Sequence, residues 1–394
     1  MPKIVRIINR FNLGGPTFNA AYLTRYLEPE YETILVGGVK NDDEESSEFI
    51  LDSLGIKPLI LPEMSRNINW WNDRIAYNKI REIIADTKPD IVHTHASKAG
   101  ALGRMAAYKL KVPAIVHTFH GNVFKGYFNP LKNYFYKSIE RKLAVKTNAI
   151  IAISELQKSE LVLEHKICTD IKVHVIPLGF DLWRFNENKQ EKREKFRKEF
   201  TLKDDEIAIG ITGRLVPIKN HKMFLNAITF LKAKSNHKIK SFIIGDGEIR
   251  SELVEYANNL NLKVSTPENI LLDADIIFTS WRKDIDVVNA GLDIVALSSD
   301  NEGTPVSLIE AQASGKPIVT TDVGGIKDIV EQNKTAFLVP KGDAQQMAFK
   351  LYELVENNAL RNKMAEHGWE HVKNKFHYTR LVSDVKRLYS SLLS

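Results

Sequence analysis

The sequence predicts an α/β protein built on two doubly wound parallel sheets, and three observations lead to this fold class. Short β-branched runs recur, each followed by a longer stretch with helical spacing, which is typical of parallel strands joined by crossover helices. A chain of 394 residues is too long for one ordinary core, and 43% apolar residues is too many for a disordered protein. We therefore expect two Rossmann-like domains facing a cleft, where ligands bind beyond the carboxyl ends of the strands.

The predicted strands form two series. In the first half they are 4–8, 33–36, 91–95, 114–118, 149–153 and 173–176, and in the second half 207–212, 241–244, 275–278, 294–297 and 317–321. A turn-rich exit at 177–181 and a highly charged stretch at 187–203 separate the series. We place the boundary near residue 180, which gives domains of 1–180 and 181–375 and a final helix within 376–394.

Composition excludes several classes of protein. There is no run of about 18 uncharged apolar residues, and the chain starts directly with a strand-like run instead of a signal peptide, so we expect a cytoplasmic protein. The single cysteine, Cys168, cannot form an intramolecular disulfide, and we expect a structural thiol. The net charge of +6 suits a polyanion, an anionic membrane surface or a phosphorylated ligand, and does not choose among them.

The stretch 298–311, SSDNEGTPVSLIEA, carries the most chemical information. It follows a buried-looking strand and then begins a helix, with Thr304 as the N-cap and Pro305 at the first helical position. The unpaired amides of a helix start favour a phosphate. Glu302 and Glu310 would bracket this anion site and accept hydrogen bonds from sugar hydroxyls. The alternative is an ordinary capped helix with a solvated glutamate.

A basic loop, 213–219, follows the first strand of the second half. Arg214 offers a planar fork to phosphate oxygens and Lys219 a mobile point charge, and together they could neutralise a diphosphate. Two basic residues in a loop usually belong to a solvated surface, which is the alternative interpretation.

The first half offers a glycine turn and paired histidines. Gly14 and Gly15 follow the opening strand and allow the backbone to approach a ligand closely. The third glycine of the dinucleotide fingerprint is missing, which disfavours a dehydrogenase. Histidines at 93, 95, 117 and 120 end two strands, but neither pair has an adjacent carboxylate or thiolate, so we expect no metal site. His120, beside a glycine, is expected to point into the cleft.

Taken together, these motifs resemble the family 4 retaining glycosyltransferases of the GT-B fold. The matching residues are Gly14-Gly15, His120-Gly121, Gly213-Arg214 with Lys219, and Glu302 and Glu310 with seven residues between them. Their order and approximate spacing match over nearly the whole chain. The amino-acid sequences of segments 14–20 and 302–311 are similar to those of bacterial transferases of surface-polysaccharide assembly. The resemblance implies retaining hexosyl transfer from a nucleotide-sugar to a glycan or lipid-linked acceptor, with a final helix that crosses back to the first domain.

The resemblance also implies roles for individual residues. Arg214 and Lys219 would hold the donor diphosphate, and Glu310 the ribose hydroxyls. Glu302 would contact the donor sugar, and His120 would lie beside it. Further donor contacts would come from Gly14, Gly15, Trp281, Gly303, Thr304, Pro305, Ser307 and Leu308. Such enzymes need no divalent metal, so we expect no cofactor besides the nucleotide-sugar co-substrate.

Two departures from the family pattern concern the donor. Asn220 follows the lysine where the family often has glycine, so we expect a differently shaped phosphate loop. The segment 262–275 is longer than usual, which leaves the base open, and we favour uridine because it is common among similar enzymes. The leaving diphosphate would itself take the acceptor's proton, which explains the lack of a nucleophile and base pair.

An aromatic and basic stretch, 123–147, contains a single acid, Glu140. It could rest on the anionic inner face of a membrane and admit a lipid-linked acceptor, or it could be a core-packed helix with solvated lysines. No nucleic-acid recognition motif is present, and the oligomeric state is not indicated. The functions that compete with transfer are a nucleotide-sugar epimerase or hydrolase of the same fold and a non-catalytic nucleotide-sugar-binding scaffold.

Overall fold

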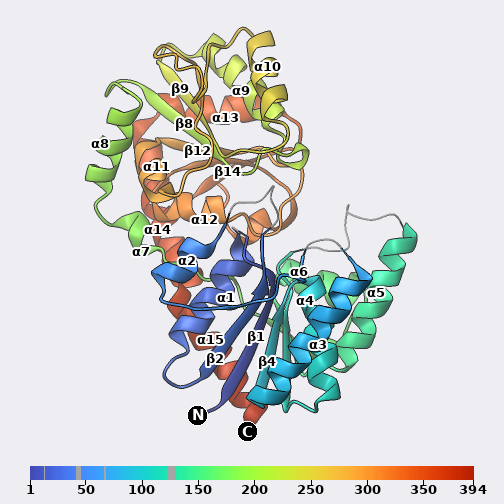
Figure 1. Cartoon of the computed structure of the whole chain (residues 1–394). Helices are drawn as coiled ribbons and strands as arrows, with labels where there is room; N and C mark the ends of the chain where they lie inside the picture. Colours follow the sequence, from blue (N-terminus) through green and yellow to red (C-terminus); the bar gives the residue numbers. More distant parts are fainter. Residues whose placement is uncertain (13, 41–45, 66–67, 122–129) are drawn as a thin grey trace. The chain divides into compact units, whose positions relative to one another are not determined.

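The computed structural model describes residues 1–394 except 13, 41–45, 66–67 and 122–129. Contacts divide the chain into two compact units. Unit 1 contains Met1–Phe180 and Lys375–Ser394, and unit 2 contains Asp181–Asn374. Each unit has a seven-stranded parallel sheet, which confirms the predicted α/β fold class (Figure 1).

Unit 1 has the strand order β3-β2-β1-β4-β5-β6-β7. Its strands are β1 Lys3–Arg10, β2 Glu32–Gly38, β3 Leu59–Ile60, β4 Ile91–His95, β5 Ala114–Thr118, β6 Ala149–Ala152 and β7 Val173–Val175. Its helices are α1 Gly15–Tyr26, α2 Glu48–Ser53, α3 Trp70–Thr87, α4 Ser97–Lys109, α5 Pro130–Val145, α6 Glu155–Ser159 and α15 Tyr378–Leu393. The strand order reverses between β1 and β4, which makes this pair the switch point of the sheet.

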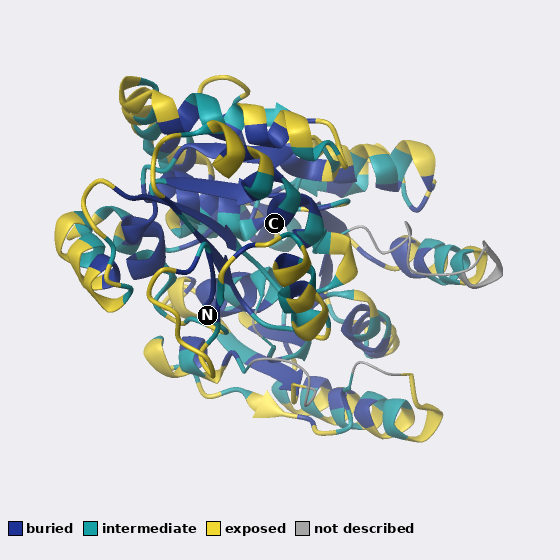
Figure 2. Ribbon diagram, turned by 90° about the horizontal axis from the view of Figure 1, so that it is seen from above, coloured by how far each residue is buried: buried dark blue, intermediate teal, exposed yellow. Residues whose placement is uncertain are grey.

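The two faces of this sheet carry different helices. Ile4 of β1 belongs to a core with Leu23 of α1 and Tyr389 of α15, whereas its neighbour Val5 belongs to a core with Ile80 of α3. Successive side chains of a strand point to opposite faces, so this alternation is what buries both faces. The inner strands β4 and β5 are buried throughout, whereas the edge strand β3 is exposed; Figure 2 colours buried residues dark blue and exposed residues yellow.

Unit 2 has the strand order β10-β11-β9-β8-β12-β13-β14, with its switch point between β8 and β12. Its strands are β8 Ile207–Thr212, β9 Ile239–Ile244, β10 Val264–Ser265, β11 Ile276–Phe278, β12 Ile294–Leu297, β13 Ile318–Thr321 and β14 Ala336–Val339. Its helices are α7 Trp183–Asn186, α8 Lys189–Glu199, α9 His221–Lys234, α10 Arg250–Asn259, α11 Ile285–Gly291, α12 Val306–Ala313, α13 Ala344–Glu356 and α14 Asn358–Lys375, with 3-10 turns η3 Pro217–Lys219 and η4 Gly324–Asp328.

The strands predicted from sequence are all present, with small shifts at their ends, and β3, β10 and β14 were not predicted. All three lie at sheet edges. β3 and β10 have two residues each, which is too short for an alternating pattern to be visible. β14, with the sequence AFLV, has one β-branched residue and therefore gives a weak strand signal.

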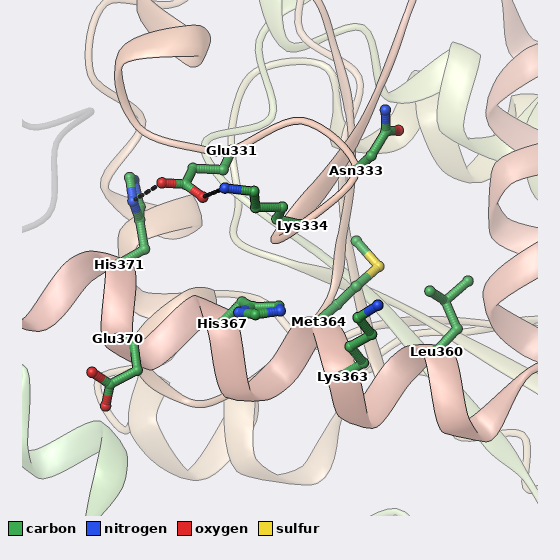
Figure 3. Close-up of a pocket in the computed structure, with 9 residues that line it drawn as sticks. All are labelled: Glu331, Asn333, Lys334, Leu360, Lys363, Met364, His367, Glu370 and His371. Carbon is green, nitrogen blue, oxygen red and sulfur yellow. Dashed lines mark ion pairs between the residues drawn. The ribbon is translucent and has the colours of Figure 1, made fainter.

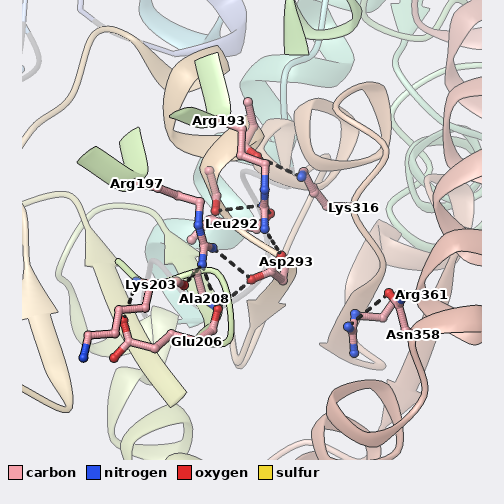
Figure 4. Close-up of polar contacts among 12 residues, drawn as sticks. Arg193, Arg197, Lys203, Glu206, Ala208, Leu292, Asp293, Lys316, Asn358 and Arg361 are labelled. Atoms are coloured by element: carbon pink, nitrogen blue, oxygen red, sulfur yellow. Dashed lines mark hydrogen bonds and ion pairs between the residues drawn. The ribbon is translucent and has the colours of Figure 1, made fainter. Parts of the chain in front are cut away.

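A group of cations fastens α8 to the start of β12 (Figure 4). Asp293, the residue before β12, accepts a hydrogen bond from Arg193 Nη2 at 2.8 Å, and Arg197 Nη1 lies 3.5 Å from its other carboxylate oxygen. Lys316 Nζ donates to Ala290 O at 3.0 Å near the end of α11, and burial lowers the pKa of this amine to about 7. The charged stretch between the two strand series is thus a helix attached through its basic side chains.

Two predictions from composition can be followed in the structure. Among the described residues, no helix combines the length and the apolar character needed to cross a bilayer. Burial raises the pKa of the Cys168 thiol to about 11, so this side chain stays protonated near neutral pH.

Candidate active site

The predicted donor residues Arg214, Lys219 and Glu302 lie after β8 and β12, the two strands at the switch point of unit 2. Arg214 follows β8 and Lys219 ends η3. Glu302 lies between β12 and α12. Ligands of open α/β sheets bind in the crevice outside such a switch point. The fold therefore brings the basic loop and the acidic loop to one edge of the sheet.

Lys219 and Glu302 are in direct contact. Lys219 Nζ lies 2.6 Å from Glu302 Oε1, and the Ser299 hydroxyl donates to the same oxygen at 2.6 Å. The Glu302 side chain is 9% exposed and that of Lys219 24%. An ammonium group has three donors, so Lys219 can hold Glu302 and still donate to an anion.

Asn220 takes a backbone conformation that explains why glycine is not required after the lysine. Its φ of 47° and ψ of 48° lie in the left-handed region, where asparagine is tolerated better than most residues. Its side chain accepts a hydrogen bond from Met223 N at 3.2 Å and so caps α9. A second bond, from Asn220 Nδ2 to Asp300 Oδ1 at 3.0 Å, ties the basic loop to the acidic loop.

Two glycines allow neighbouring loops to press against the site loops. A Cβ on Gly245, where φ is +137°, would lie 2.0 Å from Gly213 O. A Cβ on Gly324, where φ is +53°, would lie 1.9 Å from Glu302 O. Gly325 N donates to that same carbonyl at 3.0 Å. Only glycine fits at either contact, and the site loops are consequently supported by the loops after β9 and β13.

Helix α12 begins one residue later than predicted. Pro305 is the N-cap, with φ −68° and ψ 104°, and Val306 is the first helical residue. The prediction of Thr304 as N-cap and Pro305 as first helical residue is therefore wrong, because the extended ψ keeps Pro305 outside the helix. No side chain caps α12, and Leu308 N already bonds to Pro305 O at 3.1 Å. The amides of Val306 and Ser307 thus form the helix start that can face an anion.

Glu310 lies in the second turn of α12 and is partly exposed. Burial raises the pKa of its carboxyl group to about 7, while Arg184 lowers it and Asp286 raises it further. Near neutral pH this group therefore exists both as the acid and as the carboxylate.

Trp281 follows β11 and is 40% exposed. The residues on either side of it are fixed: the Ser280 hydroxyl donates to Asp246 Oδ2 at 2.8 Å, and Arg282 Nε donates to Asp284 Oδ1 at 2.8 Å. The indole is therefore presented on an anchored loop. The long segment expected before this loop contains β10 and lies at the edge of the sheet.

In unit 1 the glycine turn begins α1. Gly14 is the N-cap of α1 and Gly15 its first residue. Thr17 N donates to Gly14 O at 3.1 Å, and the Thr17 hydroxyl donates to Asn12 O at 2.8 Å. A Cβ on Gly14 would meet no described atom closer than Pro16 Cδ at 3.7 Å. Packing among the described residues does not require a glycine here, which leaves room for close approach by a ligand.

His120 lies just after β5 and contacts a row of buried polar side chains. Its Nε2 is 2.9 Å from His95 Nδ1, and burial lowers the pKa of His120 to about 3. The guanidinium of Arg6 lies 3.0 Å from His93 Nδ1 and 3.5 Å from His95 Nε2. A cation in this position would repel a metal ion. No cluster of metal-ligating side chains occurs in the described part of the chain.

A hollow of about 470 Å³ in unit 2 is a separate feature (Figure 3). It is lined by Glu331, Asn333, Lys334, Leu360, Lys363, Met364, His367, Glu370 and His371. The lining residues between 331 and 334 lie in a loop before β14 and the others lie on α14, whereas Arg214, Lys219 and Glu302 follow β8 and β12. Glu331 is already engaged, with Lys334 at 3.2 Å and His371 at 3.3 Å.

Sequence reasoning missed several residues of these networks. Ser299 orients Glu302, and its signal was a pair of serines directly after a buried strand. Arg6 was overlooked, although an arginine in the middle of the apolar run IVRII signals a buried charge. His95 could be placed on the same face as His93 by the period of a strand, but its contact with His120 could not.

Comparison with known proteins yields two family models in tandem. "Glycosyltransferase Family 4" matches residues 13–184, and "Glycosyl transferases group 1" matches residues 192–371. The UDP-Gal:alpha-D-GlcNAc-diphosphoundecaprenol alpha-1,3-galactosyltransferase of Escherichia coli is 29% identical over 342 residues, covering 86% of this chain and 84% of the relative. The capsular polysaccharide biosynthesis glycosyltransferase CapM of Staphylococcus aureus is 26% identical, covering 84% of each chain.

Solved structures share the fold over the whole length. A glycosyltransferase of Rickettsia africae has a TM-score of 0.79 at 22% identity, covering 100% of this chain and 99% of that one. Anabaena Alr3699/HepE in complex with UDP has a TM-score of 0.80 at 18% identity, covering 99% and 100%. The two family models divide the chain as its two sheets do. The chain belongs to the glycosyltransferases that join a family 4 domain to a group 1 domain, and it is a glycosyltransferase.

Proposed function

We propose that this glycosyltransferase transfers a sugar with retention from a uridine diphosphate donor to a glycan or lipid-linked acceptor of a surface polysaccharide. The observation that carries the proposal is the contact between Lys219 and Glu302 at the switch point of unit 2, beside the uncapped start of α12. A cation, a carboxylate and free helix amides at one edge suit a ligand that combines phosphates with hydroxyl groups.

The chemistry follows from the charge that develops on the leaving group. As the glycosidic bond breaks, the diphosphate gains negative charge, which Arg214, Lys219 and the α12 amides would stabilise. The acceptor hydroxyl attacks from the same face, and its proton passes to the departing diphosphate. The sugar keeps its anomeric configuration, and no enzyme nucleophile is required. These cations also take the part that a divalent metal would otherwise play.

The remaining site residues position the donor. Glu302, oriented by Ser299 and Lys219, would accept hydrogen bonds from sugar hydroxyls, and Glu310 would accept them from the ribose. Trp281 offers an exposed ring to the base. His120 and the Gly14-Gly15 turn would contact the sugar and phosphates. Uridine is supported by the relative named for UDP-Gal and by the fold neighbour in complex with UDP.

An anionic membrane surface is supported by the exposed side of unit 1. On α5, Tyr134 and Phe135 are 71% and 61% exposed, while Glu140 is turned inward to Arg104 at 2.6 Å. At the start of α3, Trp70 and Trp71 are 86% and 79% exposed. Exposed aromatic rings beside lysines favour a headgroup interface. Residues 123–129 of the predicted stretch lie outside the described residues. The E. coli relative's name includes a diphosphoundecaprenol acceptor.

A thermal-shift panel tests the donor. UDP, GDP, ADP and their sugars are added to the full chain and to a Lys219→Ala variant. We expect UDP and a UDP-sugar to raise the melting temperature of the wild type, because a ligand that binds only the folded state stabilises it. The variant should respond much less. If none of the nucleotides shifts the wild-type melt, the donor assignment is wrong.

Sedimentation with liposomes tests the membrane surface. We expect the protein to sediment with vesicles containing anionic phospholipid at low salt, and to be released as salt screens the charges. A Trp70→Ser, Trp71→Ser double variant should bind less while keeping its response to UDP. Failure of the wild type to bind anionic vesicles at low salt would remove this part of the proposal.

A further inference from the structure

The polar row behind His120 begins at Arg6, an arginine that is fully buried in the middle of β1. No carboxylate of the described residues lies within 4.0 Å of its guanidinium nitrogens. Its Nη1 instead contacts His93 Nδ1 at 3.0 Å and His95 Nε2 at 3.5 Å. Burying a cation without an opposing charge costs free energy, so we look for a role of Arg6 other than that of an ion-pair partner.

A guanidinium can only donate hydrogen bonds, and this property fixes the protons of its partners. His93 Nδ1 must accept from Arg6, and the Tyr389 hydroxyl lies 2.5 Å from the same nitrogen. The proton of His93 therefore lies on Nε2, which contacts Thr118 Oγ1 at 2.7 Å. His95 Nε2 must also accept, and the proton of His95 then lies on Nδ1. Both rings are neutral in this arrangement, and burial lowers the pKa values of both well below the usual range.

The same logic reaches His120. His95 Nδ1 donates to His120 Nε2 across 2.9 Å, so His120 Nε2 is an acceptor and the proton of His120 lies on Nδ1. That Nδ1 is buried and has no hydrogen-bond partner among the described residues. An unpaired buried N–H is unfavourable, and an oxygen atom of a ligand would satisfy it.

We propose that Arg6 is a positioning residue which, through His95, sets the tautomer of His120 so that His120 presents an N–H donor to an oxygen of the bound donor sugar. His120 then cannot serve as a general base, because one ring nitrogen carries the proton and the lone pair of the other is used by His95. The identity of the ligand rests on the proposed function, whereas the tautomer does not.

The test is a two-bond 1H–15N correlation spectrum of the full chain labelled with 15N-histidine, which reports which ring nitrogen carries the proton. His120 is assigned by comparison with His120→Gln. We expect the Nδ1–H form of His120 between pH 6 and pH 8. In Arg6→Met and in His95→Leu we expect His120 to move toward the Nε2–H form. Arg6→Lys, which keeps a donor, should preserve the wild-type form.

Two controls lie on the other face of the same sheet. His117 pairs with Thr94 Oγ1 at 2.9 Å, and its signals should not change in Arg6→Met. Arg104→Met removes an equally buried arginine, which is paired with Glu140, and should leave the His120 signals in place. Both controls separate loss of the Arg6 contacts from a general disturbance of unit 1.

Kinetics provide the second measurement. We expect Arg6→Met to lower kcat by about fivefold with little change in the KM of the donor, because one hydrogen bond to the reacting sugar is weakened. Arg6→Lys should retain most of the wild-type kcat. A wild-type His120 protonated on Nε2, or an unchanged His120 spectrum in Arg6→Met, would overturn the proposal. The spectra need no nucleotide, so a failed UDP response would contradict the proposed function without affecting this result.

Discussion

Burial acts in opposite directions on the site residues of the two units. In unit 1 it lowers the pKa of His120 to about 3, and in unit 2 it raises the pKa of Glu310 to about 7. The cause is the same in both, because a low-dielectric environment disfavours the charged form of either group. The usual order of the two groups is thereby reversed. Near neutral pH the group that titrates is the carboxyl of unit 2, and the imidazole of unit 1 is a fixed neutral donor.

The units also differ in the partners of the cations next to their predicted site residues. In unit 2, Lys219 is paired with the carboxylate of Glu302. In unit 1, the Arg6 guanidinium contacts the imidazoles of His93 and His95, although a second buried arginine of this unit, Arg104, is paired with Glu140. Unit 2 thus places charges where an anion is expected to bind, whereas unit 1 uses one charge to orient neutral hydrogen-bonding groups.

The largest effect is expected from the cations of unit 2. Lys219→Ala and Arg214→Ala should fold normally and lower kcat by about 10²- to 10³-fold, the typical cost of one lost electrostatic contact to a leaving group. Lys222→Ala is the matched control, because Lys222 is an exposed lysine of the adjacent α9 paired with Glu252. Steady-state transfer assays measure all three. Near-normal turnover in both site variants would contradict the assigned roles.

Asp293→Asn probes the pairing of cations in unit 2 away from the site. Removing this charge breaks the ion pairs of Arg193 and Arg197 with Asp293, and we expect the free energy of unfolding to fall by about 2–3 kcal/mol. Urea denaturation measures the change in the free energy of unfolding, and amide hydrogen exchange in α8 and α11 shows whether the loss is local to this cluster. Asp273→Asn, which removes an exposed pair with Lys263, should not change stability measurably. Equal effects of the two substitutions would show that the Asp293 cluster is not special.

The pH dependence of UDP affinity tests whether Glu310 of unit 2 is the group that titrates near neutral pH. With a pKa of about 7, the ionised fraction of Glu310 falls about tenfold between pH 8 and pH 6, and UDP affinity should fall with it. Glu310→Gln should bind UDP more weakly at pH 8 and show a flat profile, as measured by titration calorimetry. Persistence of the inflection in Glu310→Gln would assign it to another group.

The same pKa has the opposite effect on folding. The folded-state pKa of Glu310 lies above that of the unfolded chain, so the folded protein binds the proton more readily. This contribution to stability is fully present below the unfolded pKa and is lost as pH rises through about 7. Nucleotide affinity therefore rises over the window in which this part of the stability falls.

The smallest effect is expected at Asn220. Asn220→Gly keeps the left-handed backbone but loses the cap of α9 and the hydrogen bond to Asp300, so stability should fall by about 1 kcal/mol. Asn220→Ala loses the same contacts and also places a Cβ in the left-handed region, and we expect about 2 kcal/mol. Urea denaturation distinguishes the two. If alanine costs no more than glycine, the left-handed conformation is not what selects asparagine here.

The sequence alone predicts both parallel sheets, because buried strands read as β-branched runs at regular spacing. It also predicts that Arg214, Lys219 and Glu302 come after strands and that Glu310 lies in the helix that follows, and the structure places them there. It misses edge strands of two residues and misplaces the start of α12 by one residue, since the ψ of Pro305 is not encoded in the residue type.

What only the tertiary structure decides is which of these residues touch. Lys219 and Glu302 are 83 positions apart, and they meet because β8 and β12 are neighbours in the sheet. Arg6 and His95 are 89 positions apart and meet in the same way across β1 and β4. The directions of the pKa shifts of His120 and Glu310 likewise depend on burial, which arises only when distant segments pack together.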